Sequence, residues 1–489
     1  MPIGQASQVR EIDRISMQKY GISGLTLMKN AAKAVYNELY ASLTLETKVC
    51  ILCGRGNNAG DGFALAPMLV GLVDSVTVVL LCGRSFSPDA KYYFDQLPPT
   101  VNVSETFLEA DIYVDAVFGT GFYGNLPQNV ADAFRKVNSS SALSVAIDVP
   151  SGINSDTGER AEDCFKADMT VTFEILKYCH ILPYGRDCCG AVKVGNIGLA
   201  PQAYNEVGLS TRLLDGYTLT EKNPYIHKGS NGTLYALVGS QRYQGAATLS
   251  VMSALRGGCG IVMAFVPRSV YLPLTCKVNG AVVLCCEQTE EGTHSTDVIG
   301  KFVEEVRNRP PSAILIGSGM GLNDSFKDVL GSIVKYDFPC VVDGDGLRYV
   351  GTVLPKKNTI LTPHVGEFSR LCGITTAEIA ANRFEICKQY AKENQVILVL
   401  KDAITVITAP SGEQWVLCAP NPALAKGGSG DTLAGLIASF LAQGFAALEA
   451  AKAGVWFHSL AARFAAEEKG SNATLPEDVI EYFPKAFMS

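Results

Sequence analysis

Residues 421–435 read NPALAKGGSGDTLAG, a glycine run that leads into an apolar, helix-like segment with Asp431 at the junction. Glycine-rich loops that open helices commonly bind phosphate, because exposed backbone N–H groups and the helix dipole attract anions. This loop lacks the Gly-Lys-Ser/Thr ending of a P-loop. Asp431 instead adds a negative charge where phosphates would lie. The stretch is therefore either a phosphate site that contains a base or an ordinary helix start with an early acidic residue.

Strand-like and helix-like segments alternate before this loop. The strand candidates are TLYALVG (233–239), GIVMAFV (260–266), AILIG (313–317), CVVD (340–343), TILTP (359–363) and VILVLK (396–401), and 245–258 is a helix candidate. Three more helix candidates follow, at about 430–443, 446–468 and 475–487. Such alternation predicts βαβ units and a mostly parallel sheet.

Polar side chains follow two of these strands. His364 and Glu367 come just after one strand, and Lys401 ends another. Open α/β sheets bind ligands at the carboxyl ends of their strands, so these side chains are candidates for a site. Each also has a plainer interpretation, because His364 could cap a turn and Lys401 could be a solvated strand end.

The first half of the chain shows the same alternation. Its strand candidates are 48–53, 76–81, 111–118, 143–148 and 168–173, its helix candidates include 62–73 and 130–138, and helical stretches at about 7–20 and 24–41 precede the first strand. Residues 200–229 are polar and irregular, which indicates a domain boundary. We predict an α/β chain with two domains, 1–215 and 225–489.

Two kinds of turn in the first half carry polar groups. CGRGNNAGDGFALA (53–66) lies between a strand and a helix, but it lacks the G-x-G-x-x-G spacing of a dinucleotide loop. It is either a ligand loop or a polar turn with an asparagine cap. Asp115 and Asp148 close apolar strands at what should be the same sheet edge. Converging carboxylates and carbonyls at such an edge favour a cation.

Composition excludes several classes of protein. The 489 residues carry a formal net charge of −7, so nothing predicts binding to nucleic acid. No apolar run is long enough to span a bilayer, and no apolar leader opens the sequence. The 15 cysteines include adjacent pairs, which favours reduced thiols and a cytoplasmic enzyme. Cys50 and Cys53 should face opposite sides of a strand and share no ligand.

Seven segments of the second half, taken in order, resemble one family. They are HKG (227–229), QGAA (244–247), GSGMG (317–321), VVDGDGL (341–347), TPHVGEF (362–368), LKDAIT (400–405) and GGSGD (427–431). Together they resemble the NAD(P)H-hydrate dehydratases, which have a ribokinase-like fold. That family phosphorylates the hydroxyl of a hydrated nicotinamide cofactor, and elimination then restores the ring. The resemblance implies that Asp431 deprotonates this hydroxyl while the glycine N–H groups stabilise the phosphoryl group.

The same resemblance implies two sets of binding residues. The substrate would contact Ala246, Gly319, His364 and Asp431. The adenine nucleotide would contact Lys401, Asp402, Ala403, Ile404, Thr405, Gly427, Gly428, Ser429 and Gly430. Two departures from the family pattern are Pro420–Ala423, where Gly-Asn-Pro-Gly is usual, and Ser318, which replaces a proline.

GNNAGDG (56–62), DAVFGTG (115–121) and DVPSG (148–152) resemble the NAD(P)H-hydrate epimerase domain, a Rossmann-like doubly wound fold. The resemblance implies a potassium site at Asn58, Asp115 and Ser151, with Asp148 as acid/base group. The substrate would contact Asn57, Asn58, Ala59, Gly60, Asp61, Gly119, Thr120, Gly121, Phe122, Tyr123, Gly124, Asn125 and Asp148. Ala59 departs from the glycine that is usual at its position.

The two resemblances together imply a bifunctional enzyme that repairs hydrated NADH and NADPH. The first domain would interconvert the R and S hydrates. The second would dehydrate the S hydrate with ADP, giving AMP and phosphate. The implied cofactors are ADP, K⁺ and Mg²⁺, and the expected partners are small molecules and further copies of the chain, with no nucleic acid and no membrane. The alternative is a vitamin-precursor kinase with a non-catalytic Rossmann-like accessory domain.

Overall fold

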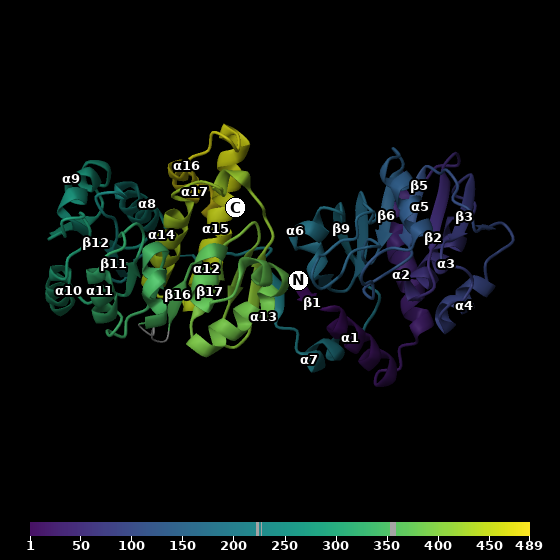
Figure 1. Ribbon diagram of the computed structural model, residues 1–489, viewed down its shortest axis with the longest axis horizontal. Helices are drawn as coiled ribbons and strands as arrows, with labels where there is room; N and C mark the ends of the chain where they lie inside the picture. The colour runs from purple at the N-terminus through teal and green to yellow at the C-terminus, as the bar shows by residue number, and fades with distance from the viewer. Residues whose placement is uncertain (222–223, 226, 353–357) are drawn as a thin grey trace. The chain divides into compact units, whose positions relative to one another are not determined.

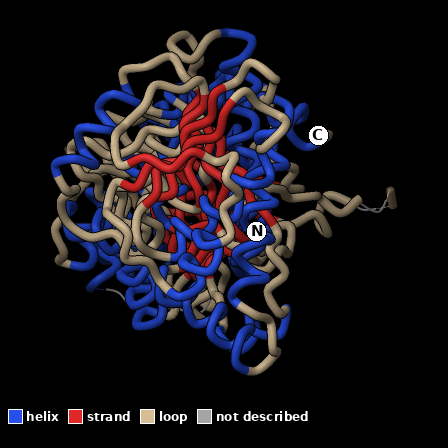
Figure 2. The backbone as a smooth tube through the Cα atoms, turned by 90° about the vertical axis from the view of Figure 1, so that its right-hand side faces the viewer, coloured by secondary structure: helices blue, strands red, loops and turns tan. Residues whose placement is uncertain are grey.

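The computed structural model describes residues 1–221, 224–225, 227–352 and 358–489. Contacts divide the chain into two compact units, Met1–Arg212 and Leu213–Ser489 (Figure 1). In Figure 2 the strands, drawn in red, are surrounded by helices, drawn in blue. That the segments 1–215 and 225–489 fold independently stays a prediction.

The first unit contains a seven-stranded parallel sheet in the order β4-β3-β2-β5-β6-β7-β9. Its strands are β2 (Lys48–Cys53), β3 (Ser75–Leu80), β4 (Asn102–Ser104), β5 (Ile112–Ala116), β6 (Leu143–Ile147), β7 (Met169–Phe173) and β9 (Ala191–Gly195). From β2 the chain builds toward one edge and then returns to place β5 on the other side of β2. The strand order therefore reverses between β2 and β5, which is where a doubly wound sheet binds ligands.

Helices cover both faces of this sheet. They are α1 (Ala6–Gln18), α2 (Gly24–Leu39), α3 (Asn57–Leu69), α4 (Pro88–Asp95), α5 (Gln128–Asn138), α6 (Pro183–Arg186) and α7 (Pro201–Val207), with 3₁₀ turns η1 (Tyr40–Ser42) and η2 (Tyr178–His180). In β2, Val49 and Cys53 pack with α1, α2 and α3, whereas Cys50 packs with α5. The predicted opposite orientation of Cys50 and Cys53 is confirmed.

A small ribbon stands apart from this sheet. Strand β1 (Pro2–Gly4) pairs antiparallel with β10 (Thr211–Leu213) and parallel with β8 (Leu176–Lys177). The expectation that helices come before any strand was therefore wrong. A strand of three residues is too short to leave a visible alternation of side chains.

The strands of the second unit follow the order β13-β12-β11-β14-β15-β16-β17-β18-β19. They are β11 (Thr233–Leu237), β12 (Ile261–Pro267), β13 (Val282–Cys286), β14 (Ala313–Ile316), β15 (Cys340–Val342), β16 (Thr359–Leu361), β17 (Ile397–Leu400), β18 (Thr405–Thr408) and β19 (Gln414–Leu417). Pairs from β13 to β17 are parallel, and β18 and β19 add antiparallel. Here too the order reverses, between β11 and β14.

Two sets of helices sandwich this second sheet. They are α8 (Gln244–Arg256), α9 (Arg268–Lys277), α10 (Asp297–Asn308), α11 (Asp324–Ile333), α12 (Val365–Cys372), α13 (Thr376–Asn394), α14 (Ser429–Ala442), α15 (Ala447–Lys469), α16 (Pro476–Glu481) and α17 (Phe483–Phe487), with η3 (Gly344–Thr352) and η4 (Pro422–Leu424). Leu234 of β11 packs with α8, α14 and α15, and the next residue, Tyr235, packs with α10, α11 and α13. The predicted α/β class, with a doubly wound sheet in the first unit and a mostly parallel sheet in the second, is confirmed.

Helices α8 and α14 lie unusually close together. A Cβ atom built on Gly435 of α14 would lie 2.3 Å from the carbonyl oxygen of Ser250 on α8. In the same contact, the hydroxyl of Ser439 donates to the carbonyl of Ala254 at 2.8 Å. This close packing fixes the position of α14, whose first turn is the GGSGD loop.

Two predicted helices have different bounds in the structure. The helix expected from residue 62 begins at Asn57, because the GNNAGDG motif itself forms its first turns. The helix expected at 475–487 is two short helices that meet at Tyr482. Pro484 has no N–H to donate to the carbonyl one turn earlier, which ends the first of them.

Candidate active sites

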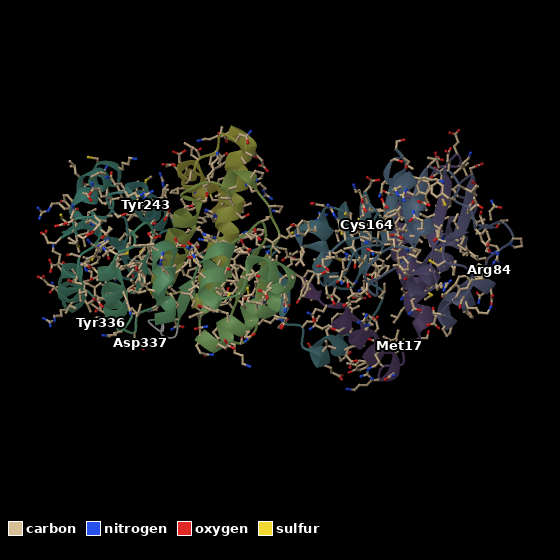
Figure 3. All side chains as sticks on the ribbon, viewed as in Figure 1. Met17, Arg84, Cys164, Tyr243, Tyr336 and Asp337 are labelled. Carbon is tan, nitrogen blue, oxygen red and sulfur yellow. The ribbon has the colours of Figure 1, made fainter. Side chains whose placement is uncertain are left out.

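A cavity of 920 Å³ lies beside the carboxyl ends of β2, β5 and β6 in the first unit. Of the residues predicted to bind substrate, eight line it: Asn57, Asn58, Asp61, Gly119, Thr120, Gly121, Phe122 and Asp148. Ala59 and Gly60 are buried within α3, and Tyr123, Gly124 and Asn125 are exposed outside the lining. Helix α1 contributes lining residues to the cavity, among them Met17, which is labelled in Figure 3.

Asp148 is held in the cavity wall by a buried lysine. Asp148 directly follows β6 and has a left-handed φ of 66°, which is uncommon for a residue other than glycine. Lys177 Nζ lies 2.6 Å from Asp148 Oδ1, and the Thr172 hydroxyl donates to the same oxygen at 3.0 Å. Burial opposes ionisation, but the Lys177 ammonium outweighs it and lowers the pKa of Asp148 below its usual value. Asp148 is therefore a carboxylate at neutral pH.

His180 fixes the backbone of the same residue. The Lys177 N–H donates to its Nδ1 at 3.1 Å, so Nε2 carries the hydrogen that the Asp148 carbonyl accepts at 3.0 Å. Burial lowers the pKa of His180 to about 3, which keeps the ring neutral. Lys177 and His180 were not found from the sequence. Their position in LKYCH, just after a strand, was the available signal.

The predicted potassium ligands gather around the backbone of Phe118. Asn58 Nδ2 donates to the Phe118 carbonyl at 3.1 Å, and the Phe118 N–H donates to Ser151 Oγ at 2.7 Å. Asp115 accepts from both the backbone N–H and the hydroxyl of Ser151, each at 2.7 Å. Burial raises the pKa of Asp115 to about 7. These neighbouring carboxylate, amide, hydroxyl and carbonyl oxygens form the kind of donor set that suits a hard cation.

In the second unit, strand ends bring the predicted residues around Asp343. This buried carboxylate follows β15 and accepts three hydrogen bonds: from Thr362 Oγ1 at 2.7 Å, Lys401 Nζ at 3.1 Å and Ser318 Oγ at 3.2 Å. Burial would lower the pKa of Lys401, but Asp343 and Glu367 outweigh it and raise the value. The ammonium is thus charged, and its hydrogen bond to Asp343 fixes its position. Asp343 lies within the motif 341–347, but no role was predicted for it.

Asp431 lies in the first turn of α14. Gly428 caps this helix with a left-handed φ of 99°. Burial, together with the charge of Asp343, raises the pKa of Asp431 to about 7 despite the opposing Lys401. A carboxylate with a pKa near the working pH is suited to act as a general base.

The glycine loop is shaped for an anion. Lys401 Nζ lies 3.1 Å from the position of a Cβ atom built on Gly430, so the ammonium faces the loop. The Ser429 hydroxyl is buried with no hydrogen-bond partner among the described residues, which leaves it free to donate to a ligand. Lys426 secures the loop from behind by donating to the carbonyls of Asn472, at 2.7 Å, and Thr474.

The remaining predicted residues lie in different surroundings. Ala246 and Gly319 are adjacent, because a Cβ atom on Gly319 would lie 2.5 Å from that of Ala246 and 2.9 Å from that of Tyr243. His364 caps α12, where its Nδ1 accepts from the Gly366 N–H at 3.0 Å, as in its plainer interpretation.

The segment after Lys401 forms the connection from β17 to β18. Asp402 pairs with the buried Arg383 at 2.8 Å and accepts from the Ala403 N–H. Ile404 is buried, and Thr405 begins β18.

Comparison with known proteins agrees with this geometry. A family model described as NAD(P)H-hydrate dehydratase matches residues 234–485, and one described as YjeF-related protein N-terminus matches residues 24–179. The chain is 32% identical to a bifunctional NAD(P)H-hydrate repair enzyme of Moorella thermoacetica, over 98% of this chain and 95% of that one. The chain belongs to the family of bifunctional NAD(P)H-hydrate repair enzymes. The predicted enzyme class, epimerase and then dehydratase, is confirmed.

Other NAD(P)H-hydrate repair enzymes are similarly close. The relative from Coxiella burnetii is 31% identical over 98% of each chain. Among solved structures, an ADP/ATP-dependent NAD(P)H-hydrate dehydratase of Bacillus subtilis, co-crystallised with ATP and Mg²⁺, is 30% identical with a TM-score of 0.48, over 55% of this chain and 94% of that one. Separately, none of the helices in the described residues is long and apolar enough to cross a membrane.

Proposed function

We propose that the cavity of the first unit interconverts R and S hydrates of NADH and NADPH, and that the glycine loop of the second unit dehydrates the S hydrate. The observation that carries the proposal is Asp431, a half-buried carboxylate with a pKa of about 7 at the start of α14, beside the charged Lys401. A base and a phosphate cradle are the two groups that phosphorylation of a hydroxyl requires.

In the second unit, the proposal assigns the substrate to Ala246, Gly319, His364 and Asp431. Asp431 takes the proton of the hydrate's hydroxyl, and the oxygen attacks the terminal phosphoryl group of ADP. The N–H groups at Gly427–Gly430 and the Lys401 ammonium stabilise the charge that develops on the phosphoryl oxygens. Phosphate then leaves with the electron pair of the C–O bond, the neighbouring ring carbon gives a proton to water as the double bond re-forms, and AMP remains.

In the first unit, the hydrated cofactor occupies the 920 Å³ cavity. The N-terminus of α3 and the side chain of Arg55, which both line it, suit the diphosphate. The hydrated ring then lies toward Asp148, the proposed acid/base group. Potassium would be held by Asn58, Asp115 and Ser151, where it would order the loops on either side of the cavity.

Several further properties belong to the same proposal. Mg²⁺ would arrive bound to the phosphates of ADP, in keeping with the ATP and Mg²⁺ of the Bacillus subtilis dehydratase crystals. We further propose a cytoplasmic homo-oligomer that acts on small molecules and binds neither nucleic acid nor membrane.

The direct test is incubation of the full chain with mixed R and S hydrates, with and without ADP, followed by chromatography. We expect interconversion without ADP, and complete recovery of NADH absorbance with ADP. A stable phosphate ester in place of NADH would instead indicate the vitamin-precursor type of kinase. In Asp148→Ala, the S fraction should be repaired at the normal rate while the R fraction remains. Full repair of the R hydrate by this variant would remove Asp148 from the mechanism.

A further inference from the structure

Seven charged side chains line the cavity of the first unit, and four of them, three carboxylates and one ammonium, influence one another electrostatically. These four come from four elements: Asp13 from α1, Asp61 from α3, Asp148 from the end of β6 and Lys177 from β8. Lys177 is 1% exposed and is paired with Asp148. Within this group of four, the one cation therefore forms its ion pair with Asp148.

The other two carboxylates are unpartnered. Among the residues that the structure describes, neither Asp13 nor Asp61 has a hydrogen-bond or ion-pair partner for its carboxylate. Burial, with the charges of Asp148 and Asp13, raises the pKa of Asp61 well above its usual value, and burial raises that of Asp13 to about 6. Near neutral pH the cavity wall thus presents a protonated Asp61 and an ionised Asp148. Two carboxyl groups whose environments push their pKa values apart in this way are candidates for a proton donor and a proton acceptor.

The reaction in this cavity needs such a pair. Hydration of a ring enamine places the hydroxyl on the carbon next to the ring nitrogen, because nitrogen stabilises a cation at that carbon. R and S hydrates differ at this carbon, so their interconversion breaks the C–O bond and remakes it on the opposite face. The leaving hydroxyl needs a proton, and the water that adds must lose one.

We propose that Asp61 is the proton donor and Asp148 the proton acceptor of this inversion, an assignment that rests on the epimerase function proposed above. Asp61 transfers its proton to the hydroxyl, and the C–O bond breaks with its electron pair going to the departing water. The nitrogen lone pair forms the C=N bond. Water then adds to the opposite face, the nitrogen regains its lone pair, and Asp148 takes the surplus proton. Asp148 then releases this proton to cavity water and Asp61 takes one from it, which restores the starting state. The reverse reaction uses the two groups in exchanged roles.

Asp13 has a different part in this assignment. Its negative charge, directed at the same cavity, favours the protonated form of Asp61 without contacting it. The other charged lining residues are Arg10, Arg55 and Asp89, and the neutral His180 lies behind Asp148. Asp13 is therefore a positioning residue that acts through the charge state of Asp61.

The test measures conversion of R hydrate to S hydrate by the full chain, without ADP, between about pH 6 and pH 10, with the enzyme-free rate subtracted. The wild-type rate should fall at high pH as Asp61 ionises. Asp61→Asn should lower the rate by on the order of 10²–10⁴, and Asp61→Glu should recover at least about tenfold over Asp61→Asn. Asp13→Asn should stay active, with its alkaline fall displaced to lower pH. ADP-dependent dehydration of the S hydrate by the same variants should be unchanged.

Different outcomes overturn different statements. The assignment of Asp61, but not the epimerase function, would be overturned by either of two results. One is an Asp61→Asn rate within about threefold of the wild type, and the other is a wild-type rate that does not fall at high pH. A wild-type chain that does not interconvert the hydrates at all would overturn the epimerase function together with this assignment. Failure to fold is separable. The folded chain keeps Asp61 protonated above its usual pKa, which costs stability at pH 8. The amide removes this cost, so the melting temperature of Asp61→Asn at pH 8 should equal or exceed the wild-type value.

Discussion

Asp431 combines two properties that a general base needs at neutral pH. Its pKa of about 7 lets it accept a proton readily, and the first turn of α14 places it beside the backbone N–H groups of the glycine loop. Asp343, which helps to raise that pKa, also holds the Lys401 ammonium at 3.1 Å. One buried carboxylate thus influences both Asp431 and the cation that faces the glycine loop.

We expect Asp431→Asn to lower the rate of dehydration by on the order of 10²–10⁴, because the amide cannot accept the proton. The Kd for ADP should change by less than about threefold, which equilibrium titration can check. Asp328→Asn, on the exposed side of α11, is the matched control and should behave as wild type. Dehydration by Asp431→Asn at a near wild-type rate would refute the assignment.

The pH profile of dehydration should show the same group. Since the carboxylate of Asp431 is the active form and its pKa is about 7, kcat should rise with pH through about 7 and level off above about 8. Because the folded pKa lies above the usual one, protonation of Asp431 stabilises the folded unit, and this stability is lost as pH rises through 7. Asp431→Asn should therefore resist urea better than wild type at pH 8 and equally at pH 4. Equal urea midpoints at pH 8 would contradict the raised pKa.

Short elements show where sequence reasoning stops. The long strands and helices of both sheets could be predicted, because buried strands such as 48–53 are continuously apolar. Strand β1 could not be predicted, because three residues are too few to show the alternation of buried and exposed side chains. At the sites, glycine and aspartate motifs pointed to Asp148 and Asp431. Asp13 and Lys177 were missed because they reach the cavity from elements far from these motifs, and only the fold brings them there.

The contact between α8 and α14 makes a prediction at the scale of the element. Gly435→Ala should destabilise the second unit by about 1–3 kcal/mol, because the added Cβ atom would meet the Ser250 carbonyl oxygen at 2.3 Å. Gly300→Ala in α10 is the control: nothing lies within 4 Å of its Cβ position, so it should be stabilising by about 0.5–1 kcal/mol. Urea unfolding measures both, and equal effects of the two substitutions would show that the helices can move apart freely.

At the scale of the whole molecule, each unit contains its own sheet, core and site. We therefore expect a chain cut between residues 215 and 222 to give two fragments that fold separately. The first fragment should interconvert R and S hydrates, and the second should dehydrate the S hydrate with ADP. Circular dichroism melts and chromatographic assays check each fragment. Two insoluble fragments, or fragments without cooperative melting, would show that neither core is sufficient alone.

The anchoring of Lys426 has a consequence for the order of events on the ribosome. Its two carbonyl partners, Asn472 and Thr474, lie 46 and 48 residues later in the chain. Domains generally fold in the order in which they are synthesised. The first unit can therefore fold while the second is still being translated. The glycine loop of the second unit, in contrast, obtains its anchors only after Thr474 has left the exit tunnel. A nascent chain that is stalled after the first unit has folded, but before Thr474 emerges, should already interconvert the R and S hydrates. It should not dehydrate either of them.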